Sequence, residues 1–158
     1  MRRVAVLLAT GLGLGRLPIA PATWASAATA LVFLLVQPRL GFPAFLALTL
    51  AVVVLALLVC GPAEKTLGHD AHPIVMDEVA GMLVTLCGAP AIGHAHPPYA
   101  ITLAAGFVLF RVFDIWKPPP VGRSQELPGA FGIVIDDVLA GLYANLSLQI
   151  LARVWPAA

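Results

Sequence analysis

The sequence IVMDEV at residues 74–79 recurs as IVIDDV at residues 133–138, and each copy opens an apolar run after a proline or a glycine. Adjacent acids on an α-helix point about 100° apart, so one can face a bundle interior while its neighbour reaches a ligand at the rim. Gly81 in the first copy and Gly141 in the second lie about a turn farther on, which allows two helices to approach closely. The repeat therefore predicts two helices that pack together and bring their acidic pairs into one site.

Four carboxylates held near one another repel unless a positive group lies among them. The four are Asp77, Glu78, Asp136 and Asp137, and Asp70 lies seven residues before the first of them. Oxygen ligands of this kind are typical of hard divalent cations, so we expect a Mg²⁺ site. The alternative is that the acids only stabilise helix N-termini through the macrodipole, worth about 0.3 to 1 kcal/mol for each residue.

The composition indicates a membrane protein. Hydrophobic residues make up 60% of the 158 residues, charged residues only 11%, and the mean hydropathy is +0.95, whereas about 25% of residues are charged in an ordinary soluble domain. The length allows one compact bundle, and we expect a single domain over residues 1–158. A net charge of +1 without a basic run argues against nucleic-acid binding. Cys60 and Cys87 lack metal-ligand spacing and are expected to be buried structural thiols.

The expected fold class is all-α, an integral membrane bundle of about five hydrophobic helices with an internal acidic helix-start repeat. Gly61 and Pro62 are expected to end the second helix, and the three prolines at 118–120 to end the fourth. Apolar runs and the breakers that bound them predict helices at about residues 24–36, 42–60, 74–87, 99–116 and 133–155.

Five crossings would divide the charged residues unequally between the two sides of a membrane. Residues 1–23, 61–73 and 117–132, with the adjoining helix ends, would hold seven of the nine basic residues and all eight acids. The other side would hold only Arg39 and Arg153. The positive-inside tendency makes the first side cytoplasmic. The alternative is that charges only avoid lipid and collect at helix ends, which predicts that both ends are populated.

A charged stripe interrupts the fourth predicted helix, where Arg111, Asp114 and Lys117 recur every three residues. An arginine and a lysine beside metal-binding acids suit a phosphate group, because a guanidinium can bind two oxygens and an ammonium acts as a point charge. Mutual salt bridging of Arg111 and Asp114 is the alternative interpretation.

The segment at residues 15–26 predicts a rigid turn that leads into the first helix. Its Arg16 is a candidate substrate-binding residue, and the hydroxyl groups of Thr23 and Ser26 would lie at the helix start near the anion. Plain helix capping explains the two hydroxyl groups equally well.

Five stretches of the chain carry a resemblance to a known family. They are GLGRLPIAPAT at 13–23, AEKTLG at 63–68, DAHPIVMDEVAG at 70–81, FRVFDIWKP at 110–118 and GIVIDDVLAG at 132–141. Together they resemble phosphatidylglycerophosphatase A, a family of bacterial inner-membrane lipid phosphatases, nearly end to end. The chain departs from the family pattern at Ala22, Ala25 and Ala130, where the family usually has glycine.

The resemblance implies a Mg²⁺-dependent enzyme that removes the terminal phosphate of phosphatidylglycerophosphate, giving phosphatidylglycerol and phosphate in phospholipid biosynthesis. It also implies a multi-pass protein of the bacterial inner membrane whose active site faces the cytoplasm, and no obligate protein partner is evident. The metal ligands expected are Asp70, Asp77, Glu78, Asp136 and Asp137. The catalytic residues expected are Asp70, Asp77, Asp137, Arg111 and Lys117. Substrate binding is expected of Arg111, Lys117, Thr23, Ser26 and Arg16, and an orienting role of Asp114 and Glu64.

A proton- or ion-coupled transporter is the rival class, because intramembrane acids and internal repeats are also typical of such proteins. A scaffold that only binds is the third possibility. A carrier requires ionisable groups near mid-membrane with access from both faces, whereas these acids are expected on one side only. The sequence therefore favours the phosphatase.

Overall fold

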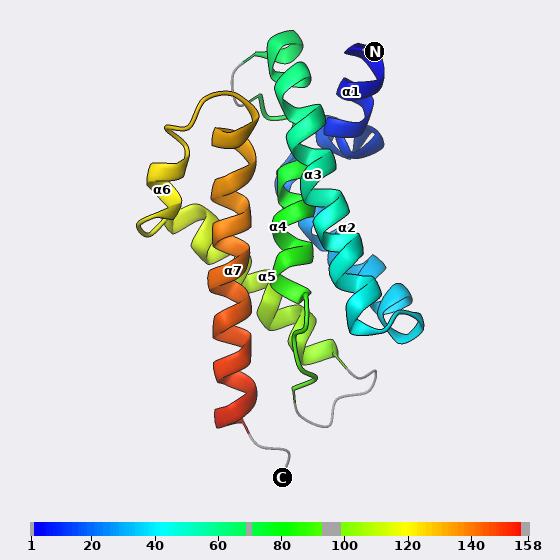
Figure 1. The fold of residues 1–158 in the computed structure, drawn as a ribbon, viewed down its shortest axis with the longest axis vertical. Coiled ribbons are helices and arrows are strands. Elements are labelled where there is room, and N and C mark those ends of the chain that lie inside the picture. The colour runs from blue at the N-terminus through cyan, green and yellow to red at the C-terminus, as the bar shows by residue number, and fades with distance from the viewer. Residues whose placement is uncertain (1, 69–70, 93–98, 156–158) are drawn as a thin grey trace.

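The computed structural model describes residues 2–68, 71–92 and 99–155, and these residues form helices and connecting turns without a strand. The all-α fold class is confirmed. Among the described residues, five main helices form the bundle; a short helix and a 3-10 helix precede them, and another 3-10 helix and another short helix lie in their connections (Figure 1). In chain order the elements are α1 (Arg2–Ala9), η1 (Gly11–Arg16), α2 (Pro21–Val36), η2 (Gln37–Arg39), α3 (Phe42–Leu67), α4 (Met76–Leu86), α5 (Ala100–Trp116), α6 (Val121–Ser124) and α7 (Ala130–Val154).

The second predicted helix does not end at Gly61 and Pro62, because α3 continues through both residues to Leu67. Proline lacks the N–H that would bond to the preceding turn, and its ring crowds that turn. The ring of Pro62 faces outward and is exposed, whereas Ala63 beside it is fully buried where α3 packs against α1. Packing of this kind holds a helix together through a proline, as is common in membrane-spanning helices.

The last helix starts three residues earlier than predicted, at Ala130 and not at about Ile133. Asp136 and Asp137 therefore lie in the second turn of α7, whereas Asp77 and Glu78 do lie in the first turn of α4. Only one copy of the repeat is thus an acidic helix start in the strict sense. The early start of α7 has a local cause, because Gly129 adopts φ 59°, a left-handed conformation that favours glycine.

The helices α4 and α7 touch through their backbones, as the two glycines of the repeat predicted. A Cβ atom added to Gly141 would lie 2.4 Å from the carbonyl oxygen of Gly81, and one added to Gly81 would lie 2.6 Å from the carbonyl oxygen of Asp137. Phe110 of α5 closes the contact from the side and is fully buried. This contact fixes the distance between the two acidic pairs.

α4 is only 11 residues long, which corresponds to about 17 Å, so it ends inside the bundle. The last carbonyl groups of a helix have no partner within it, and leaving them bare in apolar surroundings is costly. The Nδ2 atom of Asn145 on α7 donates to the carbonyl oxygens of Thr85 and Cys87 at 2.9 and 2.8 Å. Gln149 donates to the carbonyl oxygen of Gly88 at 2.9 Å. The short helix is therefore capped by side chains of its neighbour.

Three helical stretches of the described residues are long and apolar enough to cross a membrane, at residues 21–39, 42–67 and 130–154. α4 and α5, with 11 and 17 residues, are shorter. Figure 1 shows α1, the end of α3 and the start of α7 at one end of the bundle, and the end of α2 and the end of α7 at the other. The apolar helices indicate membrane association.

The backbone contact between α4 and α7 can be tested with Gly141→Ala. The added methyl group would overlap a carbonyl oxygen that cannot move without shifting α4, so we expect a loss of about 1 to 3 kcal/mol in the free energy of unfolding. The control is Gly61→Ala in α3, whose added Cβ would meet Ala130 at an ordinary 3.4 Å and should be neutral or slightly stabilising. Unfolding in detergent followed by circular dichroism measures both, and equal stability of the two variants would contradict the contact.

Candidate active site

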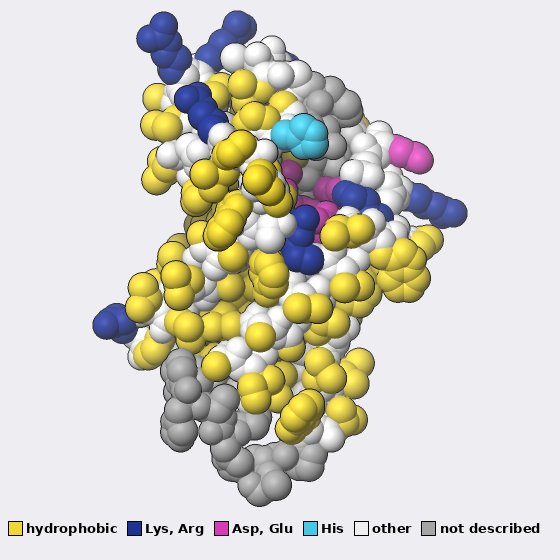
Figure 2. Space-filling view, turned by 180° about the vertical axis from the view of Figure 1, so that it is seen from behind, with side chains coloured by type: hydrophobic (Ala, Val, Ile, Leu, Met, Phe, Trp, Pro, Cys, Tyr) yellow, Lys and Arg dark blue, Asp and Glu magenta, His cyan; other side chains and the backbone are white. Residues whose placement is uncertain are grey.

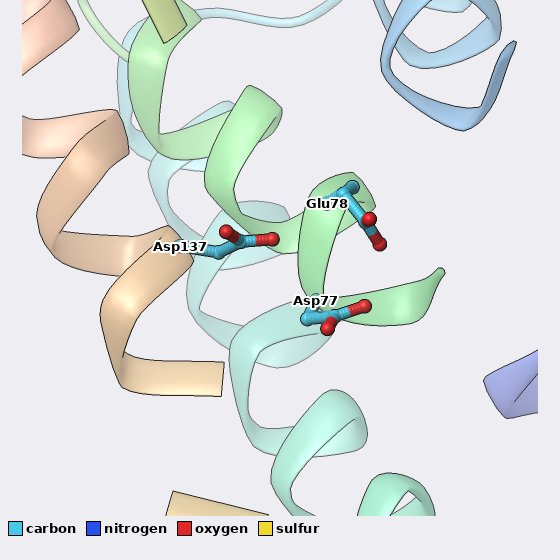
Figure 3. A group of neighbouring side chains, drawn as sticks. All are labelled: Asp77, Glu78 and Asp137. Carbon is cyan, nitrogen blue, oxygen red and sulfur yellow. The ribbon is translucent and has the colours of Figure 1, made fainter. Parts of the chain in front are cut away.

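The two acidic pairs meet between α4 and α7, as the repeat predicted. One carboxylate oxygen each from Asp77, Glu78 and Asp137 lie within 4.8 Å of one another, and Figure 3 shows Asp137 pointing from α7 toward α4. A second group with the same spacing joins Asp137 to Asp136 and to Asp114 of α5. Asp77 is 8% exposed, and Asp136 and Asp137 are each 4% exposed. Five carboxylates from three helices therefore share one buried cluster.

The cluster lines a cavity of about 200 Å³ between α4, α5 and α7. Figure 2 shows acidic and basic side chains gathered around a hollow on this face, while the surface toward the far end is mostly hydrophobic. The residues that line the cavity are Asp77, Glu78, Asp114, Lys117, Gln125, Gly132, Ile133, Asp136 and Asp137. The site is polar and small, and it lies toward one end of the bundle.

Two basic side chains border the acids. The Nζ atom of Lys117 lies 2.5 Å from Oδ2 of Asp136 and 3.6 Å from Oδ1 of Asp114. Burial lowers the pKa of Lys117, but its hydrogen bond to Asp136 and the charges of Asp136 and Asp114 outweigh burial and leave the pKa above its usual value. Lys117 is therefore protonated at neutral pH.

Arg111 reaches the site only through an ion pair, with its Nη1 atom 2.9 Å from Oδ2 of Asp114. It does not belong to the cavity wall. The mutual salt bridge that the sequence left open as an alternative thus exists, and it holds the side chain of Asp114 against the cluster. Even with both basic residues counted, the five carboxylates keep an excess of negative charge.

Three buried carboxylate oxygens of the cluster have no hydrogen-bond partner among the described residues: Oδ1 of Asp77, Oε2 of Glu78 and Oδ1 of Asp136. Burying a charged oxygen without a partner is costly, and a cation among these atoms removes the cost. A ligand set made only of oxygens suits Mg²⁺ or another hard divalent ion. The residues present therefore fit a divalent metal.

The helix macrodipole does not explain the cluster by itself. Its effect fades beyond the first turn of a helix, and Asp136 and Asp137 lie in the second turn of α7. Only Asp77 and Glu78 stand where the macrodipole would favour a negative charge. Stabilisation by the macrodipole alone, the alternative weighed from the sequence, thus accounts for at most one of the two acidic pairs.

Besides Arg111, four of the residues expected in substrate binding or orientation are not part of the cavity wall. Arg16 is exposed and lines a separate cavity of about 440 Å³ together with His72. The hydroxyl group of Ser26 donates to a carbonyl oxygen of its own helix at 2.9 Å, and Thr23 lies half-buried one turn earlier. Glu64 is half-buried near the end of α3. Asp70, expected as a metal ligand and catalytic residue, lies outside the described residues.

Gln125 and Gly132 line the cavity, and neither was expected in the site from sequence. Gln125 follows α6 in a stretch that sequence analysis treated only as a connection between helices. Gly132 stands directly before the second copy of the repeat, IVIDDV, and its position before the acids was the only signal. Both residues reach the cavity only because residues 124–129 fold back onto the start of α7, which the sequence alone does not reveal.

Comparisons with known proteins identify the family of this chain. The family model described as phosphatidylglycerophosphatase A matches residues 7–152. A phosphatidylglycerophosphatase A of Haemophilus influenzae is 38% identical over 140 residues, which cover 87% of this chain and 82% of the relative. A phosphatidylglycerophosphatase A of Escherichia coli is 34% identical over 152 residues, covering 95% and 84%. No solved structure matches the chain significantly. The chain therefore belongs to the phosphatidylglycerophosphatase A family.

Proposed function

We propose that the protein is a Mg²⁺-dependent phosphatase that hydrolyses phosphatidylglycerophosphate to phosphatidylglycerol and phosphate. The observation that carries the proposal is the set of buried carboxylate oxygens without partners beside the protonated Lys117. Such a site attracts a divalent cation and, through it and the lysine, a phosphate group. The names of the two relatives supply the substrate, because the geometry alone identifies only a phosphate carried near a membrane.

The proposed metal ligands are Asp77, Glu78 and Asp137, together with Asp136 and Asp70. When bound, Mg²⁺ would neutralise phosphoryl oxygens and polarise an attacking water. Among the ligands, Asp137 belongs to both groups of neighbouring acids and therefore joins α4 to the side of the site that faces α5. Because Asp137 is shared by the two groups, its loss would remove a ligand from both of them.

Lys117 would bind a phosphoryl oxygen and balance the charge that develops on the leaving alkoxide. Asp136 and Asp114 hold its ammonium group, so the lysine is oriented before the substrate arrives. Arg111 would add positive charge at the rim, oriented by Asp114. Preorganised charges of this kind lower an activation barrier because they do not have to reorient during the reaction.

The cavity would lie on the cytoplasmic side of the bacterial inner membrane. Most basic residues belong to the end of the bundle that holds the site, which is the pattern of a cytoplasmic face, and the relatives are bacterial. The acyl chains of the substrate would stay in the lipid while the headgroup enters the cavity. Arg16 and Thr23 would contact the headgroup beyond its terminal phosphate, and Glu64 would orient the Arg16 side of the site. Ser26 is fully buried with its hydroxyl group bonded inside α2, so the headgroup contact expected of it from the sequence is not proposed again.

Metal dependence is tested with the purified protein in detergent micelles that contain phosphatidylglycerophosphate. We expect phosphate release to fall to background after treatment with EDTA and to return with Mg²⁺, because the excess of carboxylates repels a phosphate without a cation. Ca²⁺ should restore little, since it is larger and takes more ligands. Full activity in EDTA would contradict the metal. A transporter does not hydrolyse the phosphate ester, so it would release no phosphate under any of these conditions.

The roles of the acids are tested with Asp77→Asn and Asp137→Asn, which keep the shape of each side chain and remove its charge. We expect phosphate release at saturating Mg²⁺ to fall by about 100-fold or more, as when a single charge-stabilising contact is removed from an active site. Glu126→Gln is the matched control, because Glu126 is exposed and lies outside the cavity wall. Turnover close to that of the control in both variants would remove the two acids from the site.

A further inference from the structure

The cavity has few hydrogen-bond donors for the group that it is proposed to bind. A phosphate monoester offers acceptor oxygens, whereas ionised carboxylates can only accept hydrogen bonds. Of the side chains in the described cavity wall, only those of Lys117 and Gln125 carry an N–H group. Lys117 is already engaged by Asp136 and Asp114. Gln125 is therefore the one neutral donor that this wall can direct at a phosphoryl oxygen.

Gln125 is held at the cavity by the way its backbone packs against α7. A Cβ atom on Gly132 would lie 2.8 Å from the carbonyl oxygen of Gln125 and 2.3 Å from that of Leu127. Any larger residue at position 132 would push this stretch away from the helix. The glycine thus lets residues 125–127 rest directly on the first turn of α7, one turn before the two aspartates.

The segment that precedes Gln125 is fixed as well. Val121 is fully buried, and the hydroxyl group of the buried Ser124 donates to its carbonyl oxygen at 2.7 Å. The amide groups of Glu126 and Leu127 donate to the carbonyl oxygens of Arg123 and Ser124, both at 3.1 Å. The backbone around Gln125 is therefore positioned, while its side chain is exposed at the cavity and has no hydrogen-bond partner among the described residues.

We propose that the carboxamide of Gln125 donates a hydrogen bond to a phosphoryl oxygen of the substrate and positions the phosphate between the metal ligands and Lys117. This inference rests on the proposed function. The carboxamide adds a donor without adding charge, so it can face the phosphate without forming an ion pair with the acids around it. The backbone contact at Gly132 holds the main chain of Gln125 beside the cavity, from which its side chain can reach a bound phosphate.

The test compares Gln125→Ala, Gln125→Glu and Gln125→Lys, with Glu126→Ala as the matched control on the same turn. Two quantities are measured in detergent with Mg²⁺: KM for phosphatidylglycerophosphate, and the Kd of inorganic phosphate by calorimetry. We expect Gln125→Ala to weaken phosphate binding by about tenfold, the effect of losing one hydrogen bond to a charged group. Gln125→Glu should weaken it further because it replaces the donor with a like charge. Gln125→Lys keeps a donor but adds a charge that would pair with the acids around it, so it should bind phosphate better than Gln125→Glu but not better than the unmodified protein.

A structural role of Gln125 would give a different order, because glutamate has nearly the same shape as glutamine and would be tolerated best. Wild-type Kd values in both Gln125→Ala and Gln125→Glu, or a Gln125→Glu variant that binds phosphate better than Gln125→Ala, would overturn the inference. Failure of the proposed function looks different. In that case the unmodified protein releases no phosphate from the lipid, while the affinities for inorganic phosphate still report on Gln125.

Discussion

Like charges held together in an apolar interior are the constraint on which the rest of this structure depends. Carboxylates that repel one another can normally separate or take up water. Here they cannot separate, because the backbones of α4 and α7 touch at Gly81 and Gly141 only one turn beyond the acids. The packing of two helices thus opposes the repulsion of their side chains. A bound cation would reconcile the two, and the cavity beside the acids would give it access.

The short length of α4 makes the position of its acids depend on α7. A helix that crossed the whole bundle would need only its own hydrogen bonds, but α4 ends after 11 residues. Its last carbonyl groups are satisfied by Asn145, which stands on the same helix as Asp136 and Asp137. α7 therefore secures both ends of α4, with a glycine contact near the acids and a side-chain amide at the other end. The position of the acidic pair of α4 depends on contacts along the whole length of α7.

Sequence reasoning reached the parts of this site that follow from local pattern. The repeated acidic run, the glycines after it and the apolar composition identify the all-α fold and the meeting of Asp77 with Asp137. It failed where tertiary packing decides the outcome. Pro62 is a strong helix breaker in isolation, but a proline whose ring faces outward is tolerated when its neighbour Ala63 is buried against α1. Gln125 could not be recognised either, because the path of its turn depends on how closely the backbone approaches Gly132.

The central claim is that acids of α4 and α7 share one divalent ion, and a crystal structure of the protein grown with Mn²⁺ in place of Mg²⁺ tests it most directly. The anomalous scattering of Mn²⁺ locates the ion without any assumption about the ligands. The account predicts a peak bounded by carboxylate oxygens of Asp77, Glu78 and Asp137. A fully ordered cluster with no peak among these oxygens, or an ion bound only elsewhere on the chain, would contradict it.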